Sequence, residues 1–247
     1  MSKWKIASSY IIGQGHIQKD IPCQDRTFKL VNKSSKGNFY GLSLADGAGS
    51  CKHSDIGAEH ITKKILHFLN SKFLYISKKK NPSNYILRFI EKELKSLSHK
   101  RNIIFKDLSS TLLFIAIKDN KFIIGHIGDG VIGVLDKNSN LKTLSKPMNG
   151  EFSNSTFFTT STYYKHRLRI IKGSLKESIG FILMSDGTEE SLYDKQKESL
   201  IDSNKIIINW LNKNSETKVE EGLYHNLEQV ISKQTSDDCS IGIMKRC

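Results

Sequence analysis

Acidic residues recur at the ends of apolar, strand-like segments of this chain. Asp46, Asp129 and Asp186 each follow such a segment, and a glycine comes directly after each acid. Asp25 stands shortly before a further segment of this kind, and Asp237 shortly before the last one. Carboxylates gathered at one edge of a sheet repel one another and raise each other's pKa unless cations neutralise them. An all-oxygen set of ligands suits hard divalent cations such as Mg²⁺ or Mn²⁺.

Each acid taken alone has a simpler explanation. Asp-Gly is a common turn signal between antiparallel strands, and Gly128-Asp129-Gly130 needs no further reason than a hairpin turn. The recurrence of the pattern at several strand ends is what favours a shared cation site. The glycine after each acid also allows backbone and cation to approach closely.

The segments that carry these acids alternate in blocks of strands and helices. Aromatic and β-branched residues predict strands, and apolar residues at helical spacing predict helices. The expected strands are Trp4–Ile12, Phe28–Val31, Phe39–Ala45, Thr111–Ile117, Phe122–Ile127, Val131–Leu135, one within Glu151–Thr160, Phe181–Met184 and Ser240–Met244. The expected helices are His53–Asn70, one that begins with Asn81 as cap and Pro82 in its first turn, Lys205–Leu211 and Val219–Ile231. Such blocks favour an α+β fold, with antiparallel sheets covered by helices, in a single domain over residues 1–247.

The charge of the chain is a weak guide to its partners. Thirty-eight basic residues against 25 acidic ones give a net charge of +13, but only six of the basic residues are Arg. The lysines are scattered and lack the bidentate fork of Arg, and no nucleic-acid-binding motif accompanies them. A Lys-, Asn- and Ile-biased proteome explains the excess, so we expect no nucleic-acid partner. The charge does favour attraction to acidic or phosphorylated partners.

Hydropathy and cysteine content indicate where in the cell the protein is expected. The longest uninterrupted apolar run, Leu112–Ile117, is far shorter than the roughly 18 residues of a membrane span. The N-terminus lacks an apolar stretch of signal-peptide length. The four cysteines form no C-x-x-C pair, and we expect them to be reduced thiols. A cytoplasmic, soluble protein with no membrane partner is therefore predicted.

The order of the acidic motifs resembles the metal-dependent protein phosphatases (the PPM family) of the protein phosphatase 2C type. The matching segments are Gln24-Asp25, Asp46-Gly47-Ala48-Gly49, Ser109-Ser110-Thr111 with Gly128-Asp129-Gly130, Met184-Ser185-Asp186-Gly187, and Ser236-Asp237-Asp238-Cys239-Ser240. They cover residues 13–244 in the family's order. Gly13-x-x-His16, Pro22-Cys23-Gln24-Asp25 and the later Pro147-Met148-x-Gly150-Glu151-Phe152 are similar to a compact bacterial branch, whose members are expected to reverse the action of Ser/Thr kinases.

The resemblance implies an αββα sandwich, with two central antiparallel sheets flanked by helices and a pair of Mn²⁺ or Mg²⁺ ions. Carried over, Asp46 bridges both ions, the Gly47 carbonyl binds one of them, and Asp186 and Asp237 hold the other. Asp25 orients metal-bound waters, and Asp129 with Asp186 matches a weaker third ion. In this family the bridging water becomes hydroxide and attacks the phosphoserine or phosphothreonine phosphorus in line. No cysteine nucleophile takes part, so Cys23 and Cys239 are expected to be neighbours only.

Three positions depart from the family pattern. Asp20 occupies the spacing of the Arg that grips substrate phosphate, Ala48 stands where many members carry a His proposed as general acid, and Gln24 replaces the first carboxylate. The candidate substitutes for the Arg are His16, Lys19 and Arg26. We assign His16 as the phosphate-binding and catalytic residue because the bacterial branch is similar there, although a lone His is more often structural.

The polar, Ser/Thr-rich segment Ser145–Lys165 carries interleaved phenylalanines. It is either a mobile flap that covers the site and helps to choose substrates, or a hairpin whose aromatic side chains pack inward. The leading functional hypothesis is a cytosolic Ser/Thr protein phosphatase that acts on phosphorylated proteins. The alternative is a catalytically idle phosphatase-like domain that binds phosphoproteins. The three departures from the family pattern support this alternative.

Overall fold

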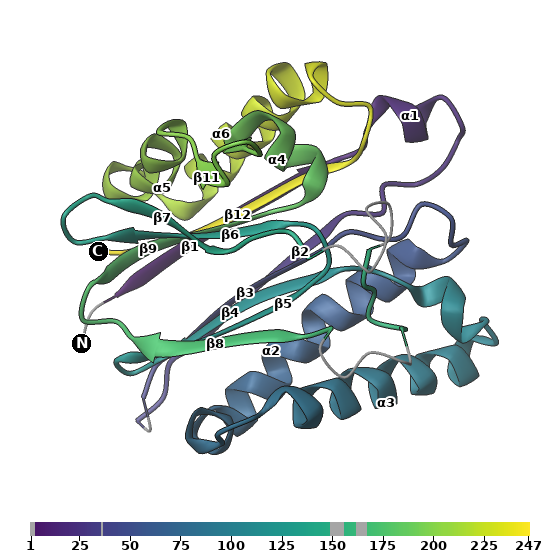
Figure 1. Ribbon diagram of the computed structural model, residues 1–247, viewed down its shortest axis with the longest axis horizontal. Helices are drawn as coiled ribbons and strands as arrows, with labels where there is room; N and C mark the ends of the chain where they lie inside the picture. The colour runs from purple at the N-terminus through teal and green to yellow at the C-terminus, as the bar shows by residue number, and fades with distance from the viewer. Residues whose placement is uncertain (1–2, 36, 149–155, 162–166) are drawn as a thin grey trace.

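Two antiparallel sheets lie face to face at the centre of the protein, and helices cover their outer faces (Figure 1). The computed structural model describes residues 3–35, 37–148, 156–161 and 167–247. The strand order is β1-β12-β9-β6-β7 in the first sheet and β2-β3-β4-β5-β8 in the second. This arrangement confirms the predicted α+β class and its αββα sandwich.

All strand pairs within the two sheets are antiparallel. The first sheet contains β1 (Trp4–Ile11), β12 (Cys239–Arg246), β9 (Ser178–Met184), β6 (Val131–Asp136) and β7 (Leu141–Ser145). The second contains β2 (Arg26–Asn32), β3 (Phe39–Ala45), β4 (Leu112–Lys118), β5 (Lys121–Ile127) and β8 (Arg169–Ser174). A two-stranded ribbon of β10 (Tyr193–Asp194) and β11 (Ser199–Leu200) stands apart from both.

Helices α2 (Ser54–Lys78) and α3 (Ser83–Arg101) cover the second sheet, as Figure 1 shows in blue and teal at the lower side. Helices α4 (Asp186–Leu192), α5 (Ser203–Lys213) and α6 (Glu216–Gln229) cover the first sheet. The other helices of the described residues are short, namely α1 (Gln14–Ile17) and the 3₁₀ turns Phe105–Leu108 and Ile231–Lys233. Ser215 caps α6 by accepting a hydrogen bond from the Lys218 N–H at 3.2 Å.

The layering follows from strands that are apolar on both faces. Along β4, Leu113, Ile115 and Ile117 face the layer between the sheets. Their neighbours Leu112 and Phe114 face α2 and α3. Successive side chains of a strand point to opposite faces, so a strand buried on both sides reads as a continuous apolar run. The run that the sequence contains at this position is therefore a central strand of the sandwich.

Several sequence-based boundaries are wrong. The first long helix continues past Asn70 to Lys78, because Phe73 and Ile76 extend its buried stripe. The second begins at Ser83 with Pro82, not Asn81, as its N-cap residue. The described residues of Glu151–Thr160, 156–160, form no strand, and the rest of that range lies outside the described residues. Within the described ranges, no helix has both the length and the apolar content that crossing a membrane requires.

Candidate active site

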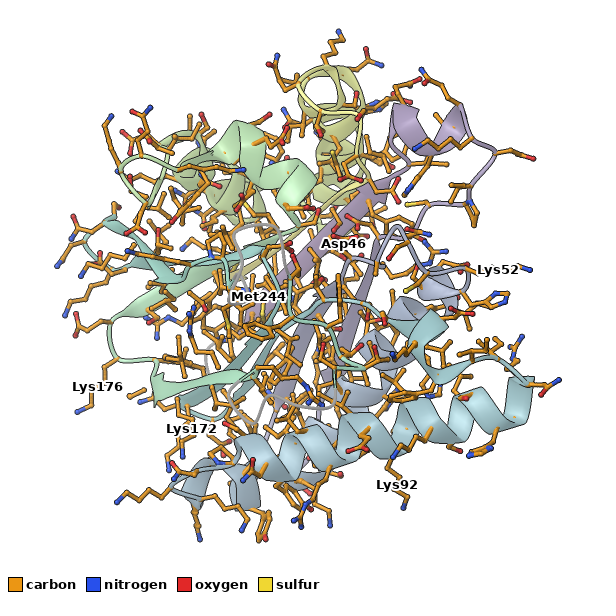
Figure 2. The ribbon with its side chains drawn as sticks, turned by 45° about the vertical axis from the view of Figure 1, so that its right-hand side comes forward. Asp46, Lys52, Lys92, Lys172, Lys176 and Met244 are labelled. Carbon is orange, nitrogen blue, oxygen red and sulfur yellow. The ribbon has the colours of Figure 1, made fainter. Side chains whose placement is uncertain are left out.

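Three of the predicted acids meet at one end of the two sheets. Asp46 follows β3 and Asp129 follows β5 in the second sheet, whereas Asp186 follows β9 in the first. One carboxylate oxygen from each lies within 4.8 Å of the others. Figure 2 shows Asp46 away from the exposed Lys172 and Lys176, toward the other end of the sandwich. The sandwich therefore brings together acids that are up to 140 positions apart in the sequence.

None of these three acids lies in a hairpin turn, so the simpler explanation of the Asp-Gly pairs is wrong. Gly128-Asp129-Gly130 connects β5 to β6, which belong to different sheets. Gly128 has a φ of 108°, a conformation that glycine adopts without strain, and a Cβ there would lie 2.5 Å from Thr111. Asp46 leads toward α2, and Asp186 begins α4. The acids thus mark crossings between layers.

Thr111 holds the backbone of Asp46 in place. Its hydroxyl accepts a hydrogen bond from the Asp46 N–H at 2.9 Å, and its own N–H donates to the Asp46 carbonyl at 2.7 Å. Thr111 directly precedes β4, which pairs with β3. The Ser109-Ser110-Thr111 motif therefore has a structural reason: it fixes the strand end from which Asp46 projects.

Burial and mutual repulsion disfavour the charged forms of these carboxylates. Burial, followed by the charges of Asp25, Asp186, Asp129 and Asp237, raises the pKa of Asp46 well above its usual range. Burial and the neighbouring Asp129 and Asp237 raise the pKa of Asp186 to about 8. A bound cation would relieve both the repulsion and the cost of burial.

Asp25 is fully buried at the start of β2, and neither of its oxygens makes a hydrogen bond of normal geometry with a described residue. Burial raises its pKa to about 7, although the nearby hydroxyls of Ser240 and Ser185 act in the opposite direction. Asp129 Oδ1 is likewise buried and without a partner among the described residues, whereas its Oδ2 accepts from Thr156 at 2.6 Å. Buried carboxylate oxygens that lack donors fit a site for hard divalent cations.

Two predicted ligands, Asp237 and Gly47, lie beside the closest group rather than within it. The charge of Asp237 raises the pKa of Asp46 and of Asp186, so it stands near both. Gly47 directly follows Asp46 and forms an isolated antiparallel bridge with Ser110. Their assignment as metal ligands, like that of Asp25 and Asp129, stays a prediction.

His16 contacts an acid that the sequence did not single out. Its Nδ1 lies 2.9 Å from Asp238 Oδ2, and Asp238 also accepts hydrogen bonds from the Gly13 N–H at 2.7 Å and the Gln24 N–H at 2.6 Å. Asp238 therefore fastens the loop between β1 and β2 to the segment before β12. Two consecutive acids before the last strand were the only sequence signal for this role. The assignment of His16 as the phosphate-binding residue stays a prediction.

The two alternatives to His16 differ in their surroundings. The Arg26 guanidinium donates to the carbonyls of Cys23 at 2.6 Å and Asp25 at 2.8 Å, and it lies 5.4 Å from the Tyr10 ring centre. These contacts occupy Arg26 with the loop itself. Lys19 is exposed at the surface.

The cysteines next to the acids are poor nucleophiles. Burial and the charges of Asp238 and Asp25 raise the pKa of Cys23. Burial and the same kind of acidic surroundings raise the pKa of Cys239 to about 12. Because the thiolate is the reactive form, both side chains are held unreactive near neutral pH.

The described residues of the expected flap are 145–148 and 156–161, and the second of these stretches contacts the residues that precede β4. The Thr159 N–H donates to the Ser110 carbonyl at 2.8 Å, and the hydroxyls of Thr160 and Ser109 contact each other. Phe157 packs against the apolar core under α2 and α3, as the inward-packing alternative expects. Phe152 lies outside the described residues, and a covering role for the segment stays a prediction.

Comparison with known proteins agrees with this geometry. The family model of protein phosphatase 2C matches residues 12–228. Serine/threonine-protein phosphatase 3 of Escherichia coli (strain K12) is 26% identical over 161 residues, which are 64% of this chain and 63% of that protein. The match thus spans less than two thirds of that relative's length.

Solved structures share the fold at low identity. Serine/threonine phosphatase Stp1 from Staphylococcus aureus gives a TM-score of 0.65 at 15% identity, over 99% of this chain and 95% of that one. The catalytic domain of PstP, in complex with two manganese ions, gives 0.63 at 14% identity over 100% and 99%. The fold is therefore that of serine/threonine protein phosphatases of this type. The chain belongs to the protein phosphatase 2C family.

Proposed function

We propose that this protein is a metal-dependent protein-serine/threonine phosphatase, which hydrolyses phosphoserine and phosphothreonine in phosphorylated proteins by in-line attack of water. The approach of Asp46, Asp129 and Asp186 to within 4.8 Å at the meeting point of the two sheets is the observation that carries the proposal. Membership of the protein phosphatase 2C family supports it. The manganese ions of the PstP structure support the choice of cation.

The acids at this end of the sheets would supply oxygen ligands for two Mn²⁺ or Mg²⁺ ions. Asp46 with the Gly47 carbonyl would hold one ion and share the other with Asp186 and Asp237, and Asp129 with Asp186 would hold a weaker third. When bound, the cations would offset the charge of the phosphoryl oxygens and strengthen water as a nucleophile. Asp25 would accept hydrogen bonds from the attacking water and so orient it.

The remaining residues of the site position these acids and the substrate. Thr111 fixes the main chain of Asp46, which keeps its carboxylate toward Asp129 and Asp186. His16, held through Nδ1 by Asp238, would contact the substrate phosphate through its other ring nitrogen. The substrates would be proteins phosphorylated by a Ser/Thr kinase.

Hydrolysis of p-nitrophenyl phosphate and of a phosphothreonine peptide tests the proposal. We expect activity with Mn²⁺, none with EDTA, and a collapse in Asp186→Asn. Asp202→Asn is the matched control, because Asp202 is 89% exposed and pairs only with Lys205 among the described residues. Activity that survives Asp186→Asn would overturn the ligand assignment. Mn²⁺ binding without turnover of either substrate would favour the idle phosphoprotein-binding domain instead.

A further inference from the structure

A cavity of about 380 Å³ opens beside the acidic cluster. Asp129 and Asp186 belong to its lining, so it is continuous with the proposed site of hydrolysis. The rest of its described lining comes from α4, from the ribbon of β10 and β11, and from the residues after β7. The proposed hydrolysis of the phosphate assigns no role to this second part of the cavity lining.

Glu189 of α4 is the central residue of this part, which we name the Glu189 pocket and define by Glu189, Tyr193, Lys195, Glu198 and Lys146. Glu189 is only 3% exposed. Its Oε1 lies 3.1 Å from Lys195 Nζ, whereas its buried Oε2 has no hydrogen-bond partner among the residues that the structure describes. A buried carboxylate oxygen without a donor is costly, and a ligand that brings a donor removes that cost.

A second acceptor in the pocket is also unpartnered. Tyr193 is 6% exposed, and its buried hydroxyl makes no hydrogen bond with any described residue. Burial and the charges of Glu198 and Glu189 raise its pKa, so the phenol stands near both carboxylates. The pocket therefore offers a cluster of acceptors, and the complementary ligand is a group rich in donors.

The lysines of the pocket do not block such a ligand. Lys195 and Lys146, which pair with Glu189 and Glu198, have side chains that are 61% and 49% exposed. The Lys146–Glu198 pair is exposed at both ends, and such pairs contribute only about 0–1 kcal/mol. The Lys195–Glu189 pair includes a buried carboxylate, and an incoming guanidinium would keep that charge compensated when it replaces the ammonium group. A guanidinium carries five N–H donors in a planar fork and can serve two carboxylates and a phenol together, which an ammonium group does less well.

We propose that the Glu189 pocket binds an arginine side chain of the substrate, close in sequence to the phosphorylated residue. This assignment rests on the proposed phosphatase function and names the substrate class that the site prefers. The phosphate would lie at the acidic cluster while the arginine side chain enters the adjoining cavity. An acidic residue at the same position would meet Glu189 and Glu198 and be disfavoured.

Phosphothreonine peptides with one arginine, placed in turn at each of the three positions on either side, test the assignment. The readout is kcat/KM for each peptide divided by that of the alanine peptide, at saturating Mn²⁺. We expect one or two positions to give a ratio of about ten, as for hydrogen bonds between charged groups. Glutamate there should give a ratio below one.

For three variants we predict the direction in which the arginine ratio changes. Glu189→Gln should bring the arginine ratio close to one, and Tyr193→Phe should lower it partway. Lys195→Met should raise it, because the competing ammonium is gone. Lys197→Met is the matched control: Lys197 lies on the same turn, pairs with Asp194 and should leave the ratio unchanged.

A ratio of one at every position, a preference for glutamate, or an unchanged ratio in Glu189→Gln would overturn the assignment while hydrolysis of p-nitrophenyl phosphate continues. If the wild type does not hydrolyse p-nitrophenyl phosphate, the proposed function is overturned, and so is the assignment of the Glu189 pocket to substrate. Thermal unfolding of each variant checks its fold. If Glu189→Gln does not fold, the opposite effects of Tyr193→Phe and Lys195→Met still decide the outcome.

Discussion

Carboxylates of two kinds lie near each other in this protein, and they differ in what surrounds them. Asp238 is 2% exposed, accepts hydrogen bonds from two backbone N–H groups and lies 2.9 Å from His16 Nδ1. Asp25 is equally buried and makes no hydrogen bond of normal geometry with a described residue, and oxygens of the half-buried Asp46, Asp129 and Asp186 lie within 4.8 Å of one another. The first arrangement holds two loops together, whereas the second leaves negative charge for a ligand to neutralise.

The difference shows that burial alone does not identify a functional acid. Asp237 and Asp238 are neighbours in the sequence, yet only Asp237 raises the pKa of Asp46 and Asp186 together. A carboxylate with donors contributes to stability, and one without donors reduces it until a cation binds. Three substitutions and one series of pH values test this contrast.

The largest effect is expected from Asp46→Asn. It removes the carboxylate whose pKa four other acids raise, and kcat/KM for p-nitrophenyl phosphate with Mn²⁺ should fall about 1000-fold, or about 4 kcal/mol. The free energy of unfolding in EDTA should stay equal or rise, because repulsion is relieved. Urea denaturation beside the kinetic assay measures both quantities. Retained activity would remove Asp46 from the site.

Asp238→Ala should lower the free energy of unfolding, which Asp46→Asn leaves equal or raises. It leaves the Gly13 and Gln24 N–H groups buried without an acceptor, and the free energy of unfolding should fall by about 3 kcal/mol. Urea denaturation measures this loss, and Asp202→Ala, at an exposed position, should change it by less than about 0.5 kcal/mol. A variant as stable as the wild type would show that Asp238 does not fasten the loops.

The metal-free protein should lose stability as pH rises. The folded-state pKa values of Asp25, about 7, and Asp186, about 8, lie above the unfolded value of about 3.9. The folded state therefore binds more protons than the unfolded state between these limits. The contribution of these groups is full below about pH 4 and is lost as pH rises through 7 and 8.

Thermal unfolding from pH 5 to pH 8.5, in EDTA and in Mn²⁺, checks this expectation. The melting temperature in EDTA should fall across the range more steeply in the wild type than in Asp186→Asn. Mn²⁺ should reverse the trend, since a ligand of the folded state stabilises it. A rise with pH in EDTA, equal in both proteins, would mean that the acids are not held close together.

The smallest effect is expected at the cysteines. Both thiols beside the acids are protonated near neutral pH, so Cys23→Ala should change kcat by less than about twofold. Treatment of the wild type with iodoacetamide, followed by the same assay, should leave activity intact. Rapid inactivation of the wild type, but not of Cys23→Ala, would assign Cys23 a part in the reaction.

The sequence predicts the central strands well, and it finds only one edge strand of each sheet, β1 and β2. Phe39–Ala45 is confirmed at both ends, because a strand covered on both faces is apolar throughout. The sequence prediction omitted β7 and β8, which form the outer edges of the two sheets. Their sequences, LKTLS and RIIKGS, are mixed because one side of an edge strand remains open.

The site also divides into residues that the sequence predicted and residues that it did not. The acids of the cluster were predictable because each stands at the end of an apolar strand. Asp238 and the Glu189 pocket were not, because their roles depend on backbone groups and side chains that only the folded chain brings near. The position of Glu189 in the sequence, within a short run of polar residues, carries no signal of its burial.

Titration calorimetry of Mn²⁺ into the metal-free protein tests the central claim most directly, followed by hydrolysis of p-nitrophenyl phosphate in the same sample. We predict at least two ions per wild-type chain, activity that rises as they bind, and loss of both binding and turnover in Asp46→Asn but not in Asp202→Asn. Activity that reaches its maximum before any Mn²⁺ is bound, or binding that Asp46→Asn leaves intact, would contradict the account.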